Sequence, residues 1–334
     1  MELYLDSADF NEIEKAFKLG FLDGLTTTPT FMHRHGVTDV DALILKLADI
    51  VPVLQVEALG KTAEEIYGEA HRLIDLGLQK DSTVFKIPIS LEGVKACRML
   101  RNEDILVNVH LVYTLQQAYM AMHAGASYVC PLVGRLQDQG HDALALVEQC
   151  VEAVNYYGYD SKIMFSSVRN IEHVRNAINI GVHTITVPYK VLQQMPENNF
   201  TTLGTEQFYE HTKLMTVKVK DVMSNVNPIV KSDTVLQEAI IKMTEYGFGC
   251  IIVVNGANEA RGVFTDGDLR RLLQKGGRDV LQQKMSDLNY NQPLTIESDE
   301  LLFKANDLFK VHKVDNLLVT EKGKPVGLLD IQDI

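Results

Sequence analysis

Residues 83–90, TVFKIPIS, form an apolar and largely β-branched run with one charged residue, Lys86, near its middle. A run of this kind is typical of a strand that is buried on both faces of a parallel sheet. Two explanations of the lysine stay open on this stretch alone. Either the stem lies along a strand end and carries the ammonium to water, or burial favours the neutral amine, which can attack a carbonyl and form a Schiff base.

Seven further apolar runs lie before about residue 190, namely ELYLD, DGLTT, VPVLQV, DILVNV, ASYVCP, KIMFSS and HTITVP. Amphipathic stretches separate many of them, at residues 63–76, 91–100, 114–123, 141–157 and 171–180. An alternation of strands with helices predicts a parallel sheet, and eight such units predict a closed (β/α)8 TIM barrel.

The polar residues of these runs fall where a barrel places its active site. Catalytic side chains of TIM barrels lie at the C-terminal ends of the strands, which meet at one mouth. The residues expected at this mouth are Asp6, Thr26, Thr27, Thr28, Gln55, Lys86, Asn108, His110, Arg135 and Ser167.

A second domain is expected after the barrel. Residues 195–206, MPENNFTTLGTE, are polar without an apolar period, and residues 208–215 predict a last helix that closes the barrel. We therefore place the barrel at residues 1–216 and an α+β domain at residues 217–334. The second domain contains a tandem repeat, at about residues 217–275 and 280–334.

Composition excludes several classes of function. The 334 residues are 46% hydrophobic and 23% charged with a net charge of −12, so a nucleic-acid-binding surface is not expected. No apolar run approaches the roughly 20 residues of a membrane span. The four cysteines show no paired spacing and the first residues do not resemble a signal peptide, which predicts a cytoplasmic protein. No compact His/Cys cluster with ligand spacing is found in the first domain, so no metal is expected.

Six ordered motifs of residues 1–215 resemble the transaldolase and fructose-6-phosphate aldolase family: MELYLDSAD, GLTTTPT, VFKIPI, YVCPLVGRLQD, SSVRN and TITVPYKVLQQM. The resemblance implies a class I aldolase in which Lys86 forms a Schiff base with a ketose phosphate. Such an enzyme cleaves a carbon–carbon bond and leaves a dihydroxyacetone-type enamine, which a transaldolase passes to an aldehyde acceptor. It needs no catalytic cofactor, and a homo-oligomer is expected.

The resemblance also assigns roles to single residues. Asp6 matches the family's carboxylate, which stabilises the iminium, although an N-cap of a helix from Ala8 is its alternative role. Asn108 matches an asparagine that orients the enamine. The residues that match donor-binding positions are Thr26, Thr28, Arg135, Ser167 and Arg169, of which the two arginines suit the phosphate.

Three positions depart from the family. Thr28 stands where the family has an asparagine, Gln55 where transaldolases have a glutamate that activates water, and Leu132 where the aldolase subgroup has a tyrosine. Another group must therefore transfer protons. His110 is our first candidate, and Glu57, on the same strand face as Gln55, is the second. Transaldolase-like transfer, aldolase-like cleavage and a catalytically silent sugar-phosphate sensor all stay open.

The second domain resembles a tandem pair of CBS motifs, which implies a regulatory site for an adenine nucleotide or another nucleotide. In GVFTDGDLRR, Thr265 and Asp268 match the residues expected to bind phosphate and ribose. The second copy, GLLDIQDI, keeps Asp333 but has Asp330 at the hydroxyl position, where a carboxylate would repel phosphate. At most one strong nucleotide site is therefore expected.

Overall fold

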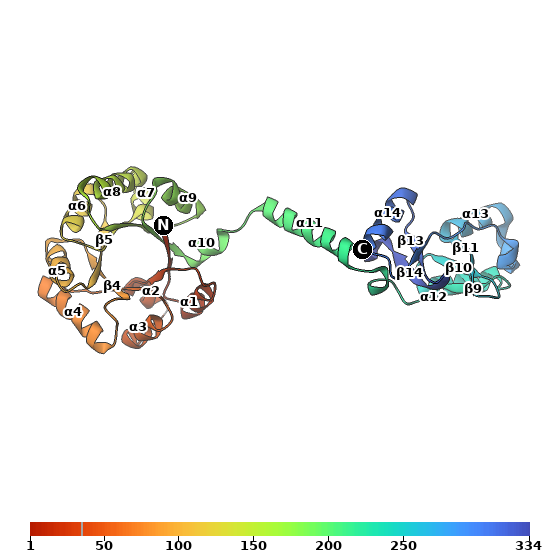
Figure 1. Cartoon of the computed structure of the whole chain (residues 1–334), viewed down its shortest axis with the longest axis horizontal. Helices are drawn as coiled ribbons and strands as arrows, with labels where there is room; N and C mark the ends of the chain where they lie inside the picture. Colours follow the sequence, from red (N-terminus) through yellow and green to blue (C-terminus); the bar gives the residue numbers. More distant parts are fainter. Residues whose placement is uncertain (35) are drawn as a thin grey trace. The chain divides into compact units, whose positions relative to one another are not determined.

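The computed structural model describes residues 1–34 and 36–334, which form two compact units, Met1–Glu197 and Asn198–Ile334 (Figure 1). The first unit is a closed barrel of eight parallel strands in sequential order. The strands are β1 (Glu2–Asp6), β2 (Gly24–Thr26), β3 (Leu54–Glu57), β4 (Thr83–Pro88), β5 (Leu106–Val112), β6 (Tyr128–Pro131), β7 (Lys162–Phe165) and β8 (Thr184–Pro188). The predicted (β/α)8 barrel is confirmed.

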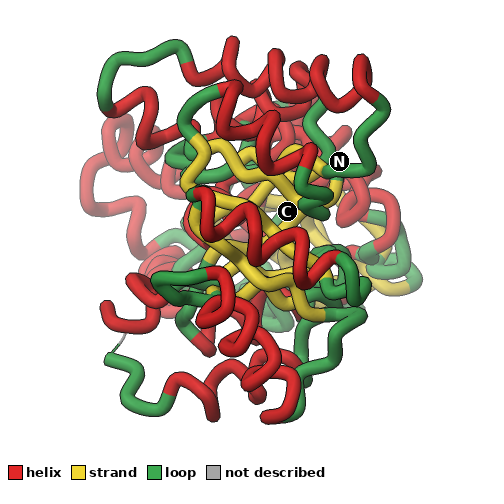
Figure 2. The backbone as a smooth tube through the Cα atoms, turned by 90° about the vertical axis from the view of Figure 1, so that its left-hand side faces the viewer, coloured by secondary structure: helices red, strands yellow, loops and turns green. Residues whose placement is uncertain are grey.

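Helices surround these strands, as the red and yellow tubes of Figure 2 show. They are α1 (Phe10–Phe17), α2 (Pro29–Arg34), α3 (Val40–Ala48), α4 (Ala63–Leu76), α5 (Leu91–Arg101), α6 (Leu115–His123), α7 (Val133–Asp138), α8 (Ala143–Tyr157), α9 (Ile171–Ile180) and α10 (Tyr189–Gln194). Polar residues fix where many of them begin: Thr62 and Thr114, for example, form capping boxes at the starts of α4 and α6.

Strand β4 shows why the site is inside the barrel. Its outward side chains, Phe85 and Ile87, are fully buried in the layer between strands and helices. Because side chains alternate along a strand, Lys86 points to the barrel interior. At the other end of the interior, Tyr4, Tyr128 and Met164 form an apolar cluster, so the polar side chains gather at the C-terminal mouth.

Strand β5 contains a bulge just after His110. Its pairing with β6 shifts register between Val109 and Val112, and Leu111 has a φ of 57°. A bulge adds one residue and redirects the side chains around it. As a result His110 is buried in the barrel mouth while Val109 and Val112 both pack in the outer core.

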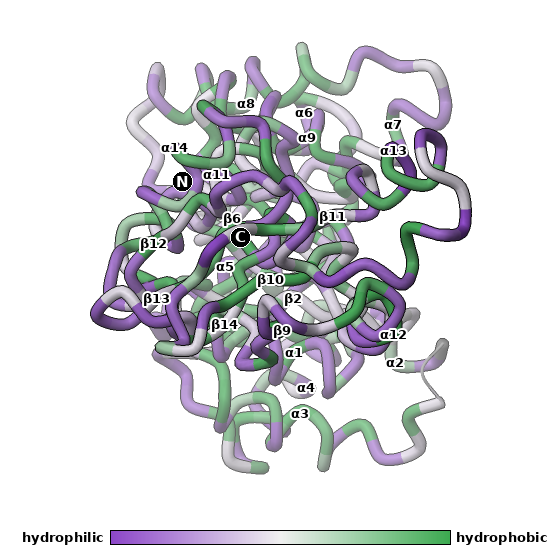
Figure 3. Tube along the Cα trace, turned by 90° about the vertical axis from the view of Figure 1, so that its right-hand side faces the viewer, coloured by the Kyte–Doolittle hydropathy of each residue, from purple (hydrophilic) through white to green (hydrophobic). Residues whose placement is uncertain are grey.

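The second unit contains two three-stranded sheets, in the orders β11-β10-β9 and β12-β13-β14, each with a helix packed on it. Their strands are β9 (Ile229–Lys231), β10 (Cys250–Val254), β11 (Ala260–Thr265), β12 (Thr295–Glu297), β13 (Asn316–Glu321) and β14 (Lys324–Asp330). The helices are α12 (Leu236–Tyr246), α13 (Asp266–Gly276) and α14 (Leu302–His312), with 3-10 turns η1 (Val219–Asp221), η2 (Gly277–Gln282), η3 (Met285–Asp287) and η4 (Ile331–Asp333). Buried residues of β10, β13 and β14 share one cluster, so the two copies of the repeat form a single α+β unit. Figure 3 shows β10 in green, as hydrophobic.

Helix α11 (Asn199–Thr216) corrects two expectations. Residues 199–206 were expected as an irregular break, but they form the first turns of this helix, because the Asn198 side chain caps it by accepting from Phe200 N and Thr201 N. The helix was also expected to close the barrel. Instead it belongs to the second unit, where it contacts α14 and where Lys213 Nζ lies 3.2 Å from the carbonyl oxygen of Asp333.

The domain boundary near residue 216 stays a prediction; the contacts of α11 group it with the second unit, so the compact units meet at residues 197 and 198. Within the part of the chain that the structure describes, no helix is long and apolar enough to cross a membrane.

Candidate active site

Lys86 lies at the centre of the candidate site, with only 5% of its surface exposed. Strand register places it beside Glu57 on β3 and Asn108 on β5. Its Nζ donates to the carbonyl oxygen of Thr27 at 3.0 Å and lies 2.9 Å from Glu57 Oε1. The amine is therefore inside the barrel mouth, and the snorkelling explanation of this lysine is wrong.

Glu57 joins two basic groups. Its Oε1 contacts the amine of Lys86, and its Oε2 lies 2.9 Å from His110 Nε2. Burial raises the pKa of Glu57, but the charges and hydrogen bonds of Lys86 and His110 outweigh it and hold that pKa below its usual value. Burial has the largest effect on His110 and lowers its pKa, which favours the neutral imidazole.

Asp6 lies at the end of β1, and its bonded partner is Thr26 rather than Lys86. Thr26 Oγ1 donates to Asp6 Oδ1 at 2.9 Å and also lies 2.5 Å from Thr186 Oγ1. Burial raises the pKa of Asp6, although Lys86 and Thr26 act in the opposite direction. The alternative N-cap role is wrong, because α1 begins at Phe10 and its cap is Asp9.

The buried side chains of Gln55 and Asn108 form a hydrogen bond inside the barrel. Asn108 Nδ2 donates to Gln55 Oε1 at 2.6 Å, and both side chains are fully buried. Gln55 Nε2, Asn108 Oδ1 and Thr27 Oγ1 are buried polar atoms that lack a hydrogen-bond partner among the described residues. Buried polar atoms are normally paired, so these three are suited to bond the hydroxyls of a ligand.

The predicted phosphate residues come together on the loops after β6 and β7. A Cβ added to Gly134 would lie 2.1 Å from the carbonyl oxygen of Ser167 and 2.9 Å from Arg169 Nε, so the two loops are in close contact. Ser167 adopts a left-handed φ of 59°. Arg135 Nη1 donates to Tyr113 Oη at 3.5 Å, and Arg169 Nη2 lies 3.0 Å from Asp138 Oδ2. Both arginines are exposed at the same edge.

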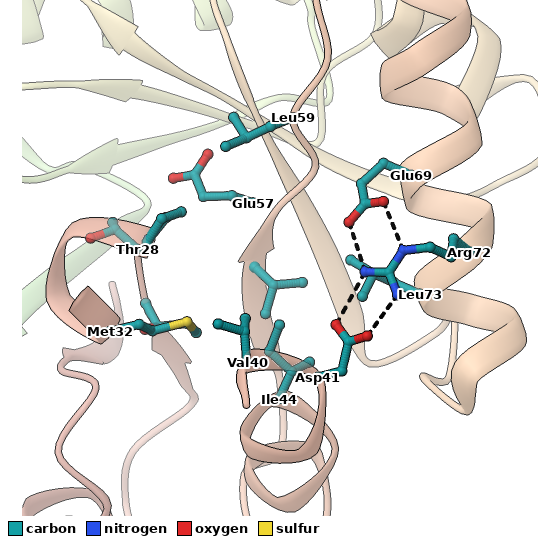
Figure 4. A pocket seen from close by; sticks show the side chains of 13 residues that line it. Thr28, Met32, Val40, Asp41, Ile44, Glu57, Leu59, Glu69, Arg72 and Leu73 are labelled. Atoms are coloured by element: carbon teal, nitrogen blue, oxygen red, sulfur yellow. Dashed lines mark hydrogen bonds and ion pairs between the residues drawn. The ribbon is translucent and has the colours of Figure 1, made fainter. Parts of the chain in front are cut away.

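A small cavity of about 140 Å³ lies beside the mouth (Figure 4). The residues that line it include Thr28, Met32, Ile44 and Glu57. In Figure 4 the carboxylate of Glu57 points away from Arg72, whose guanidinium bonds Asp41 and Glu69. Glu57 therefore has no part in that ion-pair network.

Sequence reasoning missed two contributors to the site. Thr186 on β8 holds Thr26, and the carbonyl oxygen of Thr27 holds the amine of Lys86. Inward alternation along TITVP could have indicated Thr186, whereas no sequence signal identifies a carbonyl contact. Leu132 is buried and lies at the N-cap position of α7, directly after β6 ends at Pro131.

In the second unit, Thr265 and Asp268 bond each other. Thr265 Oγ1 donates to Asp268 Oδ2 at 2.7 Å, and the pair forms the capping box of α13. Asp268 Oδ1 also lies 2.6 Å from Arg271 Nη2. Asp330 and Asp333 form the corresponding box of the second copy. In residues 1–34 and 36–334, no group of three or more His, Cys, Asp or Glu residues could hold a metal ion.

Fold and site thus define a parallel (β/α)8 barrel with a buried lysine at its mouth, followed by a duplicated α+β unit. The chain belongs to the transaldolase/fructose-6-phosphate aldolase family, whose model matches residues 3–243, and it carries a pair of CBS domains, matched at residues 219–275 and 285–334. The family match includes α11.

The relatives agree with this assignment. A probable transaldolase of Syntrophobacter fumaroxidans is 37% identical over 212 residues, a match that covers 62% of this chain and 95% of the relative. A probable transaldolase of Thermoanaerobacter sp. is 37% identical over 220 residues, covering 66% of this chain and 100% of the relative.

Solved CBS structures also resemble the chain. A CBS domain protein from Pyrobaculum aerophilum complexed with AMP is 15% identical, with a TM-score of 0.32 and coverage of 35% of this chain and 89% of that one. A CBS-domain protein from Agrobacterium tumefaciens is 21% identical, with the same TM-score and the same coverages.

Proposed function

We propose that this chain is a transaldolase-type enzyme that forms a Schiff base on Lys86. It would transfer a dihydroxyacetone-type three-carbon unit from a ketose phosphate to an aldehyde acceptor. The observation that carries the proposal is the buried amine on β4, which contacts a carboxylate at the barrel mouth. The family of the chain supports the same chemistry.

The barrel interior supports a sequence of steps. The amine adds to the donor ketone, and the iminium accepts the electron pair when the neighbouring carbon–carbon bond breaks. Asn108 Oδ1, Gln55 Nε2 and Thr27 Oγ1 would bond the donor hydroxyls and orient the enamine, because these atoms are buried and unpaired within the described chain. Asp6, oriented by Thr26, would place a carboxylate near the iminium.

His110 is proposed as the group that transfers a proton to or from the sugar during bond cleavage. Its ring is buried, and its lowered pKa keeps the imidazole neutral and able to accept a proton near neutral pH. The departures at Gln55 and Leu132 leave room for this role, since neither side chain titrates. The enzyme would thus have acid/base residues that differ from those expected in either subgroup.

The donor phosphate is proposed to bind at the loops after β6 and β7. Arg135 and Arg169 carry permanent charge, and their planar guanidinium groups can each bond two phosphate oxygens. Ser167 adds a hydroxyl to the same edge, while Thr28 lines the small cavity beside the mouth. A donor bound in this way would extend from the arginines to the amine.

Borohydride trapping tests this function. We expect reduction in the presence of a ketose phosphate to leave an adduct on Lys86, detected by peptide mass spectrometry. The variant Lys86→Met should lose the adduct and all transfer, whereas Lys80→Met, which removes an exposed lysine, should keep both. If the wild-type protein forms no adduct with any ketose phosphate, the enzyme proposal is contradicted. The hypothesis of a catalytically silent sugar-phosphate sensor would then remain.

Aldolase-type cleavage is the second candidate, because Gln55 matches the aldolase subgroup and is held by Asn108 in the site. The acceptor distinguishes the two activities. A transaldolase needs an acceptor aldehyde for turnover, whereas an aldolase releases its three-carbon product without one. Product formation should therefore be measured with and without acceptor.

We further propose that the CBS pair binds an adenine nucleotide or a related nucleotide and regulates the barrel. The CBS family match and the intact Thr265–Asp268 pair in the first copy support this. The proposal also includes self-association of the chain, since Phe200, Phe208 and Tyr209 on α11 are each more than about 70% exposed. Calorimetric titration of the full chain with adenine nucleotides tests the first point.

A further inference from the structure

We propose that Glu57 is the proton carrier of Schiff-base formation, moving the two protons that the amine of Lys86 loses onto the carbonyl oxygen of the substrate. This inference rests on the proposed Schiff base and names the residue that makes it form. It assigns to Glu57 a catalytic role, because Glu57 touches the reacting nitrogen.

The contacts distinguish Glu57 from the other acidic group of the site. Among the described residues, Glu57 is the carboxylate in ion-pair contact with Lys86 Nζ, at 2.9 Å. Asp6 instead accepts a hydrogen bond from Thr26. Arg72 does not compete for Glu57, since it bonds Asp41 and Glu69 and the Glu57 carboxylate points away from it (Figure 4).

The strand geometry explains how Glu57 can substitute for a missing acid. Gln55 and Glu57 are two residues apart on β3, so both point into the barrel. Gln55 pairs with Asn108 and cannot carry a proton. Glu57 lies one step nearer the mouth, level with Lys86 in the register of β3 and β4. On β3 the side chain that can carry a proton is therefore Glu57, beside the amine of Lys86, and not the residue at position 55.

The proton balance closes with Glu57 alone. The ammonium of Lys86 first gives a proton to Oε1, and the free amine forms the carbon–nitrogen bond while the carbonyl π electrons pass to oxygen. Glu57 gives this proton to the oxygen, takes a second proton from nitrogen and gives that one to the hydroxyl, which leaves as water. An ammonium and a ketone become an iminium and water, and Glu57 ends ionised, as it began.

His110 is the positioning residue in this step. Its Nε2 lies 2.9 Å from Glu57 Oε2, on the opposite side of the carboxylate from the amine. Both atoms are buried and neither makes a hydrogen bond of standard geometry in the described chain. A neutral imidazole that came to donate from Nε2 would hold the carboxylate in place and leave Oε1 directed at Lys86. Burial keeps the imidazole neutral by lowering its pKa.

Two reagents used on the intact full-length protein test the assignment. The first is dihydroxyacetone with cyanoborohydride, which reports imine formation and needs no phosphate site. The second is acetic anhydride, which acylates the free amine without a proton shuttle to a carbonyl oxygen. Modification of Lys86 is measured by peptide mass spectrometry in wild type, Glu57→Gln and the control Glu152→Gln, which changes an exposed residue of α8.

We expect different effects of Glu57→Gln on the two reactions. Imine formation should slow by about 100-fold, the size typical of a lost general acid–base group. Acylation should not slow, because it needs no proton transfer to a carbonyl oxygen. Glu152→Gln should change neither rate.

The positioning role of His110 has its own measurement. His110→Asn should shift the pH profile of imine formation, because Glu57 loses a donor that stabilises its ionised form, whereas a residue needed only for packing would lower the rate equally at each pH.

Several outcomes would overturn the inference. Imine formation that is unchanged or faster in Glu57→Gln would show that Glu57 only balances the charge of the amine. Failure of wild type to trap dihydroxyacetone would overturn the inference together with the Schiff base. Trapping that depends on Glu57, without transfer from any ketose phosphate, would sustain the inference while contradicting the proposed transferase.

Discussion

Two carboxylates lie near one amine, and their environments move their pKa values in opposite directions. Glu57 lies 2.9 Å from both Lys86 Nζ and His110 Nε2, and these two basic groups together outweigh its loss of hydration. Asp6 is stabilised by the charge of Lys86 and by a hydrogen bond from Thr26, but its burial outweighs both. Pairs of titratable groups whose pKa values are moved apart by their surroundings are typical of acid–base catalysis.

Asp6 should lower the stability of the folded protein at neutral pH. Burial raises the pKa of Asp6 above its usual 3.8, so the folded state binds this proton more tightly than the unfolded state does. The ionised form therefore destabilises the fold; the penalty begins to shrink as pH falls through the raised pKa and is gone below the unfolded pKa. We expect Asp6→Asn, which can still accept from Thr26, to increase the free energy of unfolding at pH 7 by on the order of 1 kcal/mol.

Urea unfolding of wild type and Asp6→Asn at several pH values measures this effect. The difference between the two proteins should shrink as pH is lowered from 7 toward the usual carboxyl range. A variant that is less stable than wild type at pH 7, by an amount that does not vary with pH, would show that Asp6 is fully compensated by its neighbours.

At the level of elements, sequence patterns predict the regular parts of the barrel well. Helices α4 and α9 have the bounds that their amphipathic periods predict, residues 63–76 and 171–180. Helix α11 was only partly predicted because none of its residues is buried, and a helix without a buried face has no apolar period. Periodicity reports packing rather than helix formation itself.

The site could be predicted only in part for a similar reason. Alternation along β3 indicates that Glu57 faces the same way as Gln55, but its contacts with both Lys86 and His110 depend on the register of three strands. The bulge at Leu111 adds a second obstacle, since leucine seldom adopts a positive φ and nothing in VNVHLVY indicates one. The nearest neighbours of the amine are thus a property of tertiary structure.

Gly134 provides a test of how two elements shape the phosphate site. A methyl group there would lie 2.1 Å from the carbonyl oxygen of Ser167, so Gly134→Ala must push α7 and the loop after β7 apart. We expect the KM for a ketose phosphate to rise by about tenfold, because Arg135 and Arg169 lose their common placement. Trapping of dihydroxyacetone on Lys86 should be unchanged.

The matched control is Gly68→Ala in α4, where an added methyl group meets nothing within 4 Å. It should leave KM unchanged and stabilise the protein by about 1 kcal/mol through helix propensity. Steady-state kinetics with the phosphorylated donor and unfolding curves of both variants provide the measurements. Equal KM values for Gly134→Ala and wild type would place the phosphate elsewhere.

At the scale of the whole molecule, the residues proposed to be catalytic belong to one compact unit and the CBS pair to the other. Regulation would be a difference in activity with and without bound nucleotide, which requires that the nucleotide favour one state of the chain over another. The intact Thr265–Asp268 pair makes the first CBS copy the expected site. Asp330 makes the second copy unfavourable, since it adds a carboxylate where phosphate would bind.

We expect Asp268→Asn in the full chain to weaken adenine-nucleotide binding by about tenfold or more, because a charged hydrogen bond to the ribose would become a neutral one. Asparagine can still accept from Thr265, so the capping of α13 is preserved. Asp333→Asn, the equivalent change in the second copy, should have little effect. Calorimetric titration measures both variants, and greater weakening by Asp333→Asn would assign the nucleotide to the second copy.

Helix α11 connects the question of domain boundary with that of self-association. The family match includes this helix, yet none of its residues is buried within its own chain and Phe200 is 84% exposed.

Chains that end at residue 197 and at residue 216 differ only by the helix and its cap. If α11 adds nothing to the barrel of a single chain, the two should have free energies of unfolding within about 0.5 kcal/mol at low protein concentration. If its apolar residues mediate association, light scattering should detect larger species for residues 1–216 than for residues 1–197, and Phe200→Ser with Phe208→Ser should reduce them. A longer chain that is more stable than the shorter one at every concentration would instead mean that α11 packs on its own barrel, and would support the boundary at residue 216.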